Sequence, residues 1–523
     1  MNINKFYSDV AKKVIPYKWE EFTMEKPLRF DANTSPTPPP SLGLFLKEME
    51  RDCPINEYAD PAYSRLKKLL ANYERADVSM ITITNSGDEA IDILGKTFLD
   101  NGDYFLIAPP TYEVYNSQLI LNKGRCLEVP LAQNNWAVDT DKIISESKNK
   151  KVKIIFLCNP NNPTGSVIPP EVISKILSNS DAIVVIDETY REFYGKTSTN
   201  LLNKYPNLVI LRSFSKFAGL AGSRIGYLLA NKELSKKFDA IRFPMGVSFL
   251  SYKLAEFVLE KDKNWIKNQV KDIKQERKCL SSELSKFGFK VYPSNANFLL
   301  VKVGSIAKEL SIKLKQKGII VRDRSSKKYL AGCVRITVRS KKENNQLIES
   351  LRVILGKTKL KKYAFLDRDG ILIFEPQDTY QIDSIEKLKI LDGVLKGLKE
   401  LKRKGYGLLI VTNQDGLGTP SFPKTDFQAP QKEMLSIFEE NDIRFKKIYI
   451  CPHLPSKKCG CRKPEIGLIK KFLRKNLVDK NNSFVCGDRT CDKLFAKNIG
   501  VKFVTMQTNG NFYQALIKEG VIL

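Results

Sequence analysis

Lys216 is a residue whose type and position could support nucleophilic chemistry. It lies in the segment LRSFSKFAGLAGSRIGY, where an apolar run ends in Ser213, Ser215 and the lysine, and Arg224 follows. A lysine amine at the end of a strand can form a Schiff base with an aldehyde. Hydroxyl groups and an arginine beside it suit a phosphate group of the same ligand. Alone the pattern is weak, because Ser-x-Ser-Lys also occurs by chance, usually in a surface turn.

Four other segments supply groups that an aldehyde-bearing aromatic ring requires. Asp187 ends the apolar run VVID, and a carboxylate beside a ring nitrogen keeps that nitrogen protonated. Asn162, in CNPNNPTG, could donate its amide to an oxygen on the ring, and Tyr112 could cover the flat ring. The helix predicted after TNSG would offer its first amides, near Gly87 and Asp88, to a phosphate. Together these segments make the pattern specific.

A second set of polar residues could act on a phosphoryl group. FLDRDGIL places Asp367 and Asp369 just after an apolar run. One carboxylate can attack phosphorus, and the other points the same way two residues later and can move the proton. Carboxylates at adjacent strand ends also form the oxygen site that Mg²⁺ prefers, and the metal offsets repulsion between aspartate and phosphate. The other polar residues of this set are Thr412, Asn413, Lys463 and Asp488.

The single histidine of the chain lies among three cysteines in CPHLPSKKCGC. Cys451, His453, Cys459 and Cys461 offer four nitrogen and sulfur ligands within one loop, which fits a closed tetrahedral zinc site. Because no ligand position remains for water, the predicted zinc is structural. We expect the other cysteines to be buried small residues in a reducing compartment, and they are Cys53, Cys126, Cys158, Cys279, Cys333, Cys486 and Cys491.

These residues need strands and helices to bring them together. Short apolar runs alternate with helical stretches from about residue 80 to 235, which predicts a mainly parallel α/β sheet. Residues 247–288 have apolar positions at helical spacing and predict long helix rather than a binding face, and residues 290–355 predict a smaller α/β domain. A second α/β alternation follows the polar, basic segment 355–362. The predicted strands of the first sheet are 80–84, 104–108, 125–129, 152–158, 182–187, 208–212 and 225–229.

Composition excludes several classes of protein. The chain has 523 residues, 42% hydrophobic and 28% charged, as in globular proteins and unlike disordered or fibrous ones. No apolar run approaches the roughly 18 residues of a membrane span. The first residues also lack the apolar stretch of a signal peptide, so we expect a cytoplasmic location and no membrane partner. The net charge of +28 suggests nucleic-acid binding, but residues 362–523 hold 28 basic and 19 acidic side chains, so the excess is spread evenly and we expect no nucleic-acid partner.

With NPNNPTG, DETY and SFSK…GSRIGY in that order, residues 5–355 resemble the fold-type I pyridoxal-phosphate aminotransferases. Among these they are most similar to the histidinol-phosphate aminotransferases. The resemblance implies a pyridoxal-phosphate aminotransferase with two α/β domains at residues 1–356. The large domain would span about 46–248, and the small domain would combine about 1–45 with 249–356.

The same resemblance implies a role for each matching residue. Lys216 would form the Schiff base and carry the proton, and Asp187 would pair with the pyridine nitrogen. Arg322 and Arg335 match arginines that bind the anionic end of the substrate, although exposed strand-end cations would give the same pattern. The other implied cofactor contacts are Asn162 and Tyr190 to the ring oxygen, Tyr112 on the ring, and Gly87, Asp88, Ser213, Ser215 and Arg224 to the phosphate, with Tyr58 contributed by the second subunit of a homodimer.

Two further matches lie near the start of the chain. Asn33, in FDANTSP, matches the first asparagine of a family Ala-Asn-x-Asn-Pro stretch and would contact the substrate. Ser35 replaces the second asparagine of that stretch, so the match is partial. Tyr17, in IPY, matches a tyrosine that contacts the substrate in the family, and the signal there is weak.

Residues 362–508 resemble the haloacid-dehalogenase phosphatases, and VTNQDGLGTPSFPKTDFQAPQ resembles their histidinol-phosphate phosphatase branch. The resemblance implies a Rossmann-like phosphatase domain with a zinc loop at 363–523, after a linker at 357–362. Asp367 would be the nucleophile and Asp369 the general acid and base. Asp367, the Asp369 main chain and Asp488 would bind Mg²⁺. Thr412, Asn413 and Lys463 would contact the phosphoryl group.

The two resemblances imply consecutive steps of histidine biosynthesis in one chain. The first half would transaminate imidazole-acetol phosphate with glutamate, and the second would hydrolyse the resulting histidinol phosphate to histidinol. One alternative is a different phosphorylated amine, with a first half like threonine-phosphate decarboxylase or a second half like the heptose-type phosphatases, which share the zinc loop. The others are a nucleic-acid-binding protein and a catalytically inactive scaffold.

Overall fold

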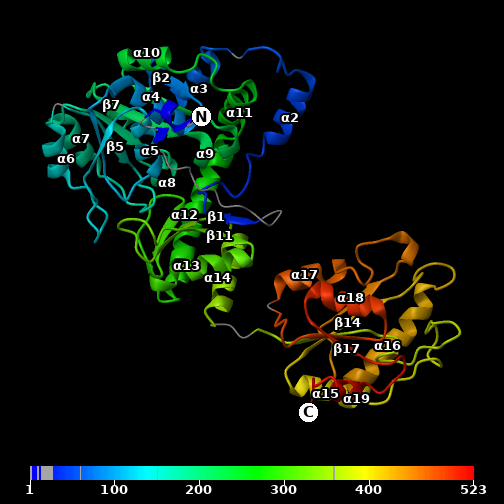
Figure 1. Ribbon diagram of the computed structural model, residues 1–523. Coiled ribbons are helices and arrows are strands. Elements are labelled where there is room, and N and C mark those ends of the chain that lie inside the picture. The colour runs from blue at the N-terminus through cyan, green and yellow to red at the C-terminus, as the bar shows by residue number, and fades with distance from the viewer. Residues whose placement is uncertain are drawn as a thin grey trace. The chain divides into compact units, whose positions relative to one another are not determined.

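The computed structural model describes residues 3–8, 11–12, 27–58, 60–149, 151–356, 360–476 and 478–522. The chain divides into two compact units, Met1–Leu355 and Gly356–Leu523 (Figure 1). The division falls at the start of the polar, basic segment that the sequence indicates as a linker. Within the described residues, no helix is both long enough and apolar enough to cross a membrane.

The first unit is built on a seven-stranded sheet with the order β2-β8-β7-β6-β5-β3-β4. β8 alone runs against its neighbours, and the other strand pairs are parallel. The predicted strands agree with the observed ones to within one residue at each end, because nearly continuous apolar runs are typical of strands covered on both faces. The strands are β2 (Ile81–Thr84), β3 (Tyr104–Ile107), β4 (Arg125–Glu128), β5 (Val152–Cys158), β6 (Ile183–Asp187), β7 (Leu208–Ser213) and β8 (Gly226–Ala230).

Helices cover both faces of this sheet, as the two apolar cores on its faces show. Along β5, Ile155 and Leu157 belong to one core and Ile154 and Phe156 to the other, as the alternation of side chains along a strand requires. The helices are α2 (Leu42–Arg51), α3 (Ser64–Glu74), α4 (Ser86–Phe98), α5 (Glu113–Leu121), α6 (Thr140–Ser147), α7 (Pro170–Asn179), α8 (Arg191–Tyr194), α9 (Phe214–Phe217), α10 (Lys232–Ile241) and α11 (Phe249–Lys261).

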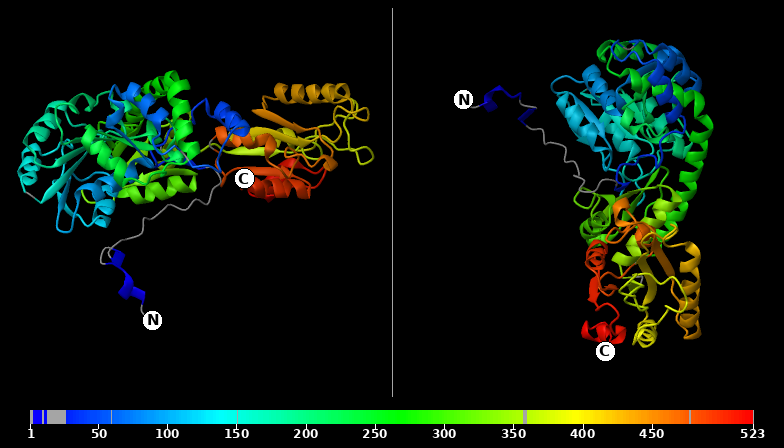
Figure 2. Two further views of the ribbon diagram at one scale, coloured as in Figure 1. Left: turned by 90° about the horizontal axis from the view of Figure 1, so that it is seen from above. Right: turned by 90° about the vertical axis from the view of Figure 1, so that its right-hand side faces the viewer.

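The helix predicted over 247–288 is confirmed but interrupted, since the segment forms α11 and then α12 (Lys263–Ser285). Asp262, between them, is buried and accepts a hydrogen bond from the Ser41 hydroxyl. The periodicity of apolar residues continues across this break, so it could not reveal the interruption. α12 carries Ile266 in a core of the large sheet and Leu280 in the core of the small sheet, and it runs from one to the other (Figure 2).

A second, five-stranded sheet of the first unit has the order β1-β11-β12-β10-β9. β1 pairs in parallel with β11, so a segment near residue 30 joins a sheet built mostly from residues after 290. This pairing brings Asn33 close to the carboxyl end of β6 in the large sheet, where its side chain contacts Tyr190. The elements are β1 (Leu28–Phe30), β9 (Lys290–Val291), β10 (Phe298–Lys302), β11 (Ile319–Asp323), β12 (Cys333–Thr337), α13 (Ala307–Gln316) and α14 (Lys341–Ile354).

The second unit contains a parallel five-stranded sheet with the order β15-β14-β13-β16-β17. The chain enters at the central strand and adds strands to both sides, so the carboxyl ends of β13, β14 and β16 meet where ligands bind such sheets. Apolar cores on both faces are covered by helices. The elements are β13 (Tyr363–Leu366), β14 (Gly407–Asn413), β15 (Lys447–Cys451), β16 (Phe484–Gly487), β17 (Lys502–Thr505), α15 (Val394–Arg403), α16 (Lys424–Glu440), α17 (Gly467–Lys475), α18 (Thr490–Ile499) and α19 (Phe512–Lys518).

Candidate active sites

A cavity of about 340 Å³ opens in the first unit at the carboxyl ends of β5, β6 and β7, next to the start of α4. It is lined by residues that the sequence indicated from segments far apart in the chain. Tyr58 does not line it: its side chain is 86% exposed. Tyr17 lies outside the described residues. The predicted residues that line the cavity are Asn33, Gly87, Asp88, Tyr112, Asn162, Asp187, Tyr190, Ser213, Ser215, Lys216, Arg224, Arg322 and Arg335.

Lys216 follows β7 and lies in the short helix α9. Its Nζ donates a hydrogen bond to the main-chain oxygen of Ala32, 3.0 Å away. Burial, and then the positive charge of Arg335, lowers the pKa of this amine to about 8. At pH 7 roughly a tenth of the Lys216 side chains therefore carry a neutral amine, which is the form that attacks an aldehyde.

Asp187, the last residue of β6, is a buried carboxylate that accepts two hydrogen bonds. The Tyr115 hydroxyl donates to its Oδ2 at 2.5 Å, and the Thr189 main-chain N–H donates to its Oδ1 at 2.9 Å. Burial raises the pKa of Asp187, while these hydrogen bonds act in the opposite direction. Tyr115 was not among the predicted site residues, because it is 72 positions away and its own segment gives no signal of this contact.

The start of α4 has the local geometry of an anion seat. Ser86, its first residue, has φ of 77°, and Gly226 of β8 lies directly behind it. A Cβ on Gly226 would lie 2.8 Å from the Ser86 carbonyl carbon and 2.9 Å from the Gly87 nitrogen, so only glycine allows this approach. Facing the seat, the Ser213 hydroxyl donates to the Ser215 hydroxyl at 2.9 Å.

Further side chains hold one another around this seat. Arg224 NH2 lies 2.7 Å from Asp88 Oδ2, and the Tyr112 hydroxyl donates to Asp88 Oδ1 at 3.0 Å. On the opposite wall, Asn33 Nδ2 donates to the Tyr190 hydroxyl at 3.0 Å. The hydroxyl groups, amides and guanidinium near this seat, together with the carboxylate of Asp187 and the amine of Lys216 in the same cavity, fit a flat aldehyde cofactor that carries a phosphate.

Asn33 is held in place by its own hydrogen bonds. Its main-chain N–H donates to the Thr337 hydroxyl, and Thr337 donates to Asn33 Oδ1 at 3.1 Å. Its main-chain oxygen accepts from Asn297 at 2.9 Å, and its φ is 54°. Ser35, which replaces the expected second asparagine, instead bonds the main-chain oxygen of Thr37 and the Gln269 side chain. At the position of the missing asparagine, Ser35 thus shapes a turn.

Two arginines from the small sheet enter the cavity side by side. Arg322 of β11 pairs in register with Arg335 of β12. Arg335 NH1 donates to Asn162 Oδ1 at 2.6 Å, and its NH2 donates to the main-chain oxygen of Asp31. The Arg335 guanidinium also lies 5.5 Å from the centre of the Phe298 ring. An anion that enters from this side meets positive charge from two adjacent strands.

In the second unit, a group of charged residues lies at the carboxyl ends of β13 and β16. Lys463 Nζ lies 2.7 Å from Asp367 Oδ2 and 2.6 Å from Asp492 Oδ1. Carboxylate oxygens of Asp367, Asp488 and Asp492 lie within 4.8 Å of one another. Asp488 Oδ1 is buried and has no hydrogen-bond partner among the described residues. This orphaned oxygen beside a second carboxylate fits a divalent cation.

The Asp369 carboxylate lies outside this group of three and has partners of its own. Its Oδ1 accepts from Arg368 NH1 at 2.7 Å, and its Oδ2 accepts from Gln414 Nε2 at 2.6 Å. Burial raises the pKa of Asp369. Gln414 also donates to the Thr412 hydroxyl at 3.0 Å, so one amide links two of the predicted residues.

Asn413 is engaged with Lys463 rather than directed at open space. Its Oδ1 accepts from the Lys463 main-chain N–H at 3.0 Å, and its Nδ2 donates to the Lys463 main-chain oxygen at 3.4 Å. Sequence reasoning also missed Arg489, whose NH2 donates to both carboxylate oxygens of Glu375, at 2.6 and 2.8 Å. The only signal for it was its place next to Asp488.

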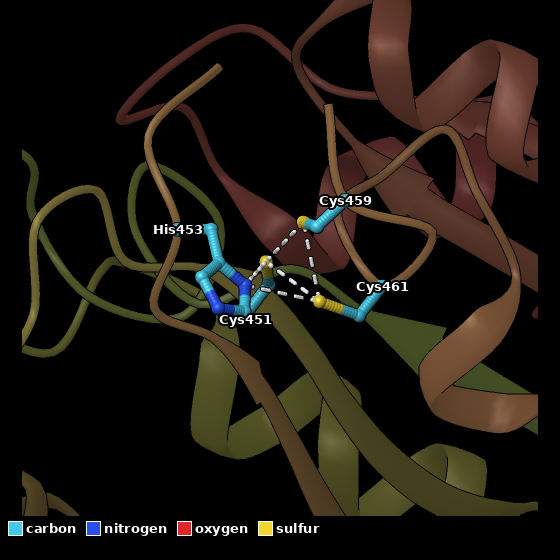
Figure 3. Close-up of side chains that lie close together, drawn as sticks. All are labelled: Cys451, His453, Cys459 and Cys461. Atoms are coloured by element: carbon cyan, nitrogen blue, oxygen red, sulfur yellow. Dashed lines mark hydrogen bonds between the residues drawn. The ribbon is translucent and has the colours of Figure 1, made fainter. Parts of the chain in front are cut away.

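The predicted zinc ligands converge in one cluster (Figure 3). Cys461 Sγ lies 3.2 Å from both Cys459 Sγ and His453 Nδ1, and Cys451 Sγ lies 3.4 to 3.7 Å from the other three donor atoms. Two ligands about 2.0–2.3 Å from one tetrahedral zinc lie at a similar separation from each other. The separations between these donor atoms therefore fit a zinc ion.

Of those seven, Cys158, Cys333 and Cys486 are buried as predicted. The prediction is wrong for Cys279, which is exposed on α12. The remaining three, Cys53, Cys126 and Cys491, are half-buried. A free thiol is small and only weakly polar, so residue type alone does not decide whether a cysteine is buried.

The two units match two different families of known proteins. Residues 27–351 match the family model of aminotransferase class I and II, and residues 362–509 match that of polynucleotide kinase 3 phosphatase. The chain is 36% identical over 357 residues to the histidinol-phosphate aminotransferase of Ruminiclostridium cellulolyticum, covering 67% of this chain and 99% of that protein. It is 37% identical over 345 residues to that of a Thermoanaerobacter species, covering 65% and 94%.

Solved structures give the same picture for the first unit. The histidinol-phosphate aminotransferase from Clostridium acetobutylicum is similar with a TM-score of 0.58 and 27% identity, covering 63% of this chain and 100% of that one. The enzyme of that name from Sinorhizobium meliloti, in complex with pyridoxal-5'-phosphate, has a TM-score of 0.62 and 24% identity, covering 67% and 98%. The latter likeness shows the fold alone.

Proposed function

The chain belongs to the class I and II aminotransferases, and on that premise we propose that its first unit transfers the amino group of glutamate to imidazole-acetol phosphate, forming histidinol phosphate. The observation that carries the proposal is the convergence of Lys216, Asp187 and Asn162 on one cavity. The names of the relatives that are 36–37% identical support the choice of substrate.

The cavity residues can be given roles around pyridoxal 5'-phosphate. When bound, this cofactor supplies an aldehyde and a ring that withdraws electrons. Asp187, held by Tyr115, would keep a proton on the ring nitrogen. Lys216, with its pKa of about 8, would hold the aldehyde carbon until the amino group of the substrate displaces it, and the freed amine would then move a proton between the substrate carbon and the former aldehyde carbon. Tyr112 would cover the ring, and Asn162 and Tyr190 would donate to its oxygen.

The phosphate of the cofactor would lie at the start of α4. The first amide groups of a helix favour an anion, and Gly87 brings one of them forward. Ser213 and Ser215 would donate their hydroxyls, and Arg224 would supply the charge that it shares here with Asp88. Holding the phosphate at the start of α4 would fix the position of the ring relative to Lys216.

For the second unit we propose hydrolysis of histidinol phosphate to histidinol and phosphate. The match of this unit to a phosphatase family model supports the reaction class. Asp367 would attack phosphorus and become an aspartyl-phosphate, and Asp369 would protonate the departing alcohol oxygen. Asp369 would then accept a proton from the water that hydrolyses the aspartyl-phosphate. Its raised pKa suits the acid role.

Lys463 and Thr412 would hold the phosphoryl oxygens in this reaction. Asp492 holds the Lys463 ammonium in place beside Asp367. Asp367, Asp488 and the Asp369 main-chain oxygen would bind Mg²⁺, which stabilises negative charge on phosphoryl oxygens. The orphaned Asp488 Oδ1 is the observation that supports the cation.

We propose a structural zinc ion at Cys451, His453, Cys459 and Cys461. The loop that holds these ligands continues directly into Arg462 and Lys463. Arg462 pairs with Asp415, which lies in the loop after β14. The zinc would therefore fix the segment from which Lys463 reaches Asp367.

A homodimer through the first unit is also part of the proposal. Tyr58 is exposed, and Leu44, Leu46 and Ile55, which precede it in the sequence, are 51%, 56% and 63% exposed. Neighbouring exposed apolar side chains are common where a surface is covered by another chain. In such a dimer Tyr58 would reach the cofactor phosphate of the partner.

One reaction mixture tests both activities. Imidazole-acetol phosphate, glutamate, pyridoxal phosphate and Mg²⁺ are incubated with the wild type, with Lys216→Ala and with Asp367→Asn. We expect phosphate release from the wild type only. Histidinol phosphate should accumulate with Asp367→Asn, and added histidinol phosphate should restore phosphate release to Lys216→Ala.

Other outcomes identify other substrates. Amino transfer to other keto acids without transfer to imidazole-acetol phosphate would remove the first assignment. If the second unit hydrolyses a heptose bisphosphate or a 3'-phosphorylated oligonucleotide but not histidinol phosphate, the second assignment fails. The oligonucleotide is included because the matching family model describes a polynucleotide phosphatase.

A further inference from the structure

Arg324 is a cavity residue that the proposed reaction leaves unused. It follows β11 directly, lines the cavity, and is 8% exposed. Its NH1 donates to Glu113 Oε2 at 3.2 Å. Its Nε is buried and has no hydrogen-bond partner among the described residues. A buried guanidinium thus faces the cavity with a donor that no protein group uses.

The side chains that line the cavity carry more positive than negative charge. Six cationic and four anionic side chains line it, an excess of two positive charges before any ligand binds. The cationic residues are Arg29, Lys216, Arg224, Arg322, Arg324 and Arg335, and the anionic residues are Asp31, Asp88, Glu113 and Asp187. The cofactor phosphate would be held at the α4 end, which leaves the arginines of the small sheet for a second anion.

One end of the cavity is lined by three arginines, Arg322, Arg324 and Arg335. Arg335 makes its hydrogen bonds to an amide oxygen and a main-chain oxygen, which carry no formal charge. Burial, together with the nearby Arg324 and Arg322, lowers the pKa of Arg335 to about 10. Guanidinium groups that repel one another at close range are stabilised when an anion binds between them.

We propose that Arg324 binds the phosphate dianion of the substrate together with Arg335, and that Glu113 holds Arg324 in place when no substrate is bound. This inference rests on the proposed transfer to a phosphorylated substrate. A dianion offers more charge and more acceptor oxygens than the single carboxylate of Glu113. Because Arg324 would leave Glu113 only for a stronger anion, this exchange of partners would favour the phosphorylated substrate over the singly charged side chain of glutamate.

Glu113 can lose its contact with Arg324 at a small cost in free energy. Its side chain is 41% exposed, so water can solvate it. Its Oε1 lies 2.8 Å from Nζ of Lys327, which is 49% exposed and does not line the cavity. When Arg324 turns to a substrate phosphate, Glu113 therefore keeps one cation and is not left unpaired.

Three variants of the full chain, each loaded with pyridoxal phosphate, test this exchange. Arg324→Gln should raise the KM for imidazole-acetol phosphate about tenfold or more, since it removes a charge-assisted contact. Glu113→Gln should lower that KM, because Arg324 is then free for the phosphate. Lys327→Gln, which breaks the other ion pair of the same carboxylate, should leave it within about twofold.

Two readouts separate the inference from its premise. The half-reaction with glutamate alone, followed by the cofactor absorbance, should keep its rate in Arg324→Gln. Inorganic phosphate should compete with the keto substrate in the wild type and more weakly in Arg324→Gln. A wild type that does not use imidazole-acetol phosphate overturns the proposed function, and with it this inference.

If the wild type uses that substrate, an unchanged KM in Arg324→Gln overturns the role of Arg324 alone. A loss of kcat with unchanged KM and unchanged phosphate inhibition would also overturn it, because that pattern marks a structural residue. Should Arg324→Gln fail to fold, Glu113→Gln decides: a lower KM supports the exchange, and an equal or higher KM overturns it.

Discussion

Nζ of Lys463 lies 2.7 Å from Oδ2 of Asp367, and both side chains are nearly enclosed by the second unit. Burial opposes the charge on Lys463, but Asp367 and then Asp492 outweigh it and raise its pKa above the usual value. The lysine is therefore a fixed positive charge beside the proposed nucleophile. It separates two carboxylates that would otherwise repel each other.

We expect Lys463→Met to lower phosphate release from histidinol phosphate at least about 100-fold, as the loss of a preorganised charge at a reacting group does. Amino transfer by the same preparation should not change. Both rates are measured on one sample, with Lys470→Met, an exposed lysine of α17, as the control. Phosphate release equal to that of the control would contradict the role of Lys463.

Removal of the Tyr115 hydroxyl should weaken cofactor binding. In Tyr115→Phe, Asp187 loses a donor and its already raised pKa rises further, so it pairs less well with a protonated ring nitrogen. The loss of one such hydrogen bond, about 1–1.5 kcal/mol, corresponds to a roughly tenfold higher Kd for pyridoxal phosphate. Equilibrium dialysis measures the Kd, and Tyr205→Phe, away from the cavity, is the control. Equal affinity in both variants would count against this account.

Attachment of the cofactor to Lys216 should follow a pKa of about 8. Below that pH the amine is protonated, so the neutral fraction falls about tenfold per pH unit. The attachment rate of the apoenzyme should therefore rise with pH and level off above about pH 8, whereas an ordinary lysine with a pKa of about 10.4 would keep gaining. Stopped-flow absorbance follows the rate.

Arg335→Met provides a check on the cause of that low pKa. Loss of a positive charge near the amine makes protonation easier, so the midpoint of the pH profile should move upward. A profile of the wild type that still rises steeply above about pH 9 would show that the cavity does not shift this lysine.

Loss of one proposed zinc ligand should affect the second unit alone. In Cys459→Ser we expect less than the one zinc ion per chain of the wild type, a lower unfolding temperature for this unit, and slower phosphate release. Structural zinc is worth on the order of 10 kcal/mol of folding-coupled affinity, against roughly 0–1 kcal/mol for a surface ion pair. Metal analysis gives the stoichiometry.

Cys279→Ser is the matched control, since Cys279 is exposed in the first unit. It should keep the zinc content, the phosphatase activity and the unfolding temperature. Amino transfer should persist in both variants. Zinc content equal to the wild type in Cys459→Ser would contradict the assignment of these four ligands.

The strands of the large sheet could be predicted closely because a strand covered on both faces must be apolar almost throughout. β5 shows this, since Val152–Cys158 has one exposed residue among seven. The break between α11 and α12 could not be predicted in the same way. At the break, Asp262 accepts a hydrogen bond from Ser41, which is 221 positions away.

The sequence by itself determined which chemical groups the two sites contain, because the amine of Lys216, the carboxylate of Asp367 and the four ligands of the cysteine loop are fixed by residue type and local order. Only the tertiary structure decided their partners. Tyr115 meets Asp187, Gln414 meets Asp369, and Arg324 meets Glu113 across 72, 45 and 211 positions. Burial and hydrogen-bond geometry arise when distant segments pack together, so no local pattern encodes them.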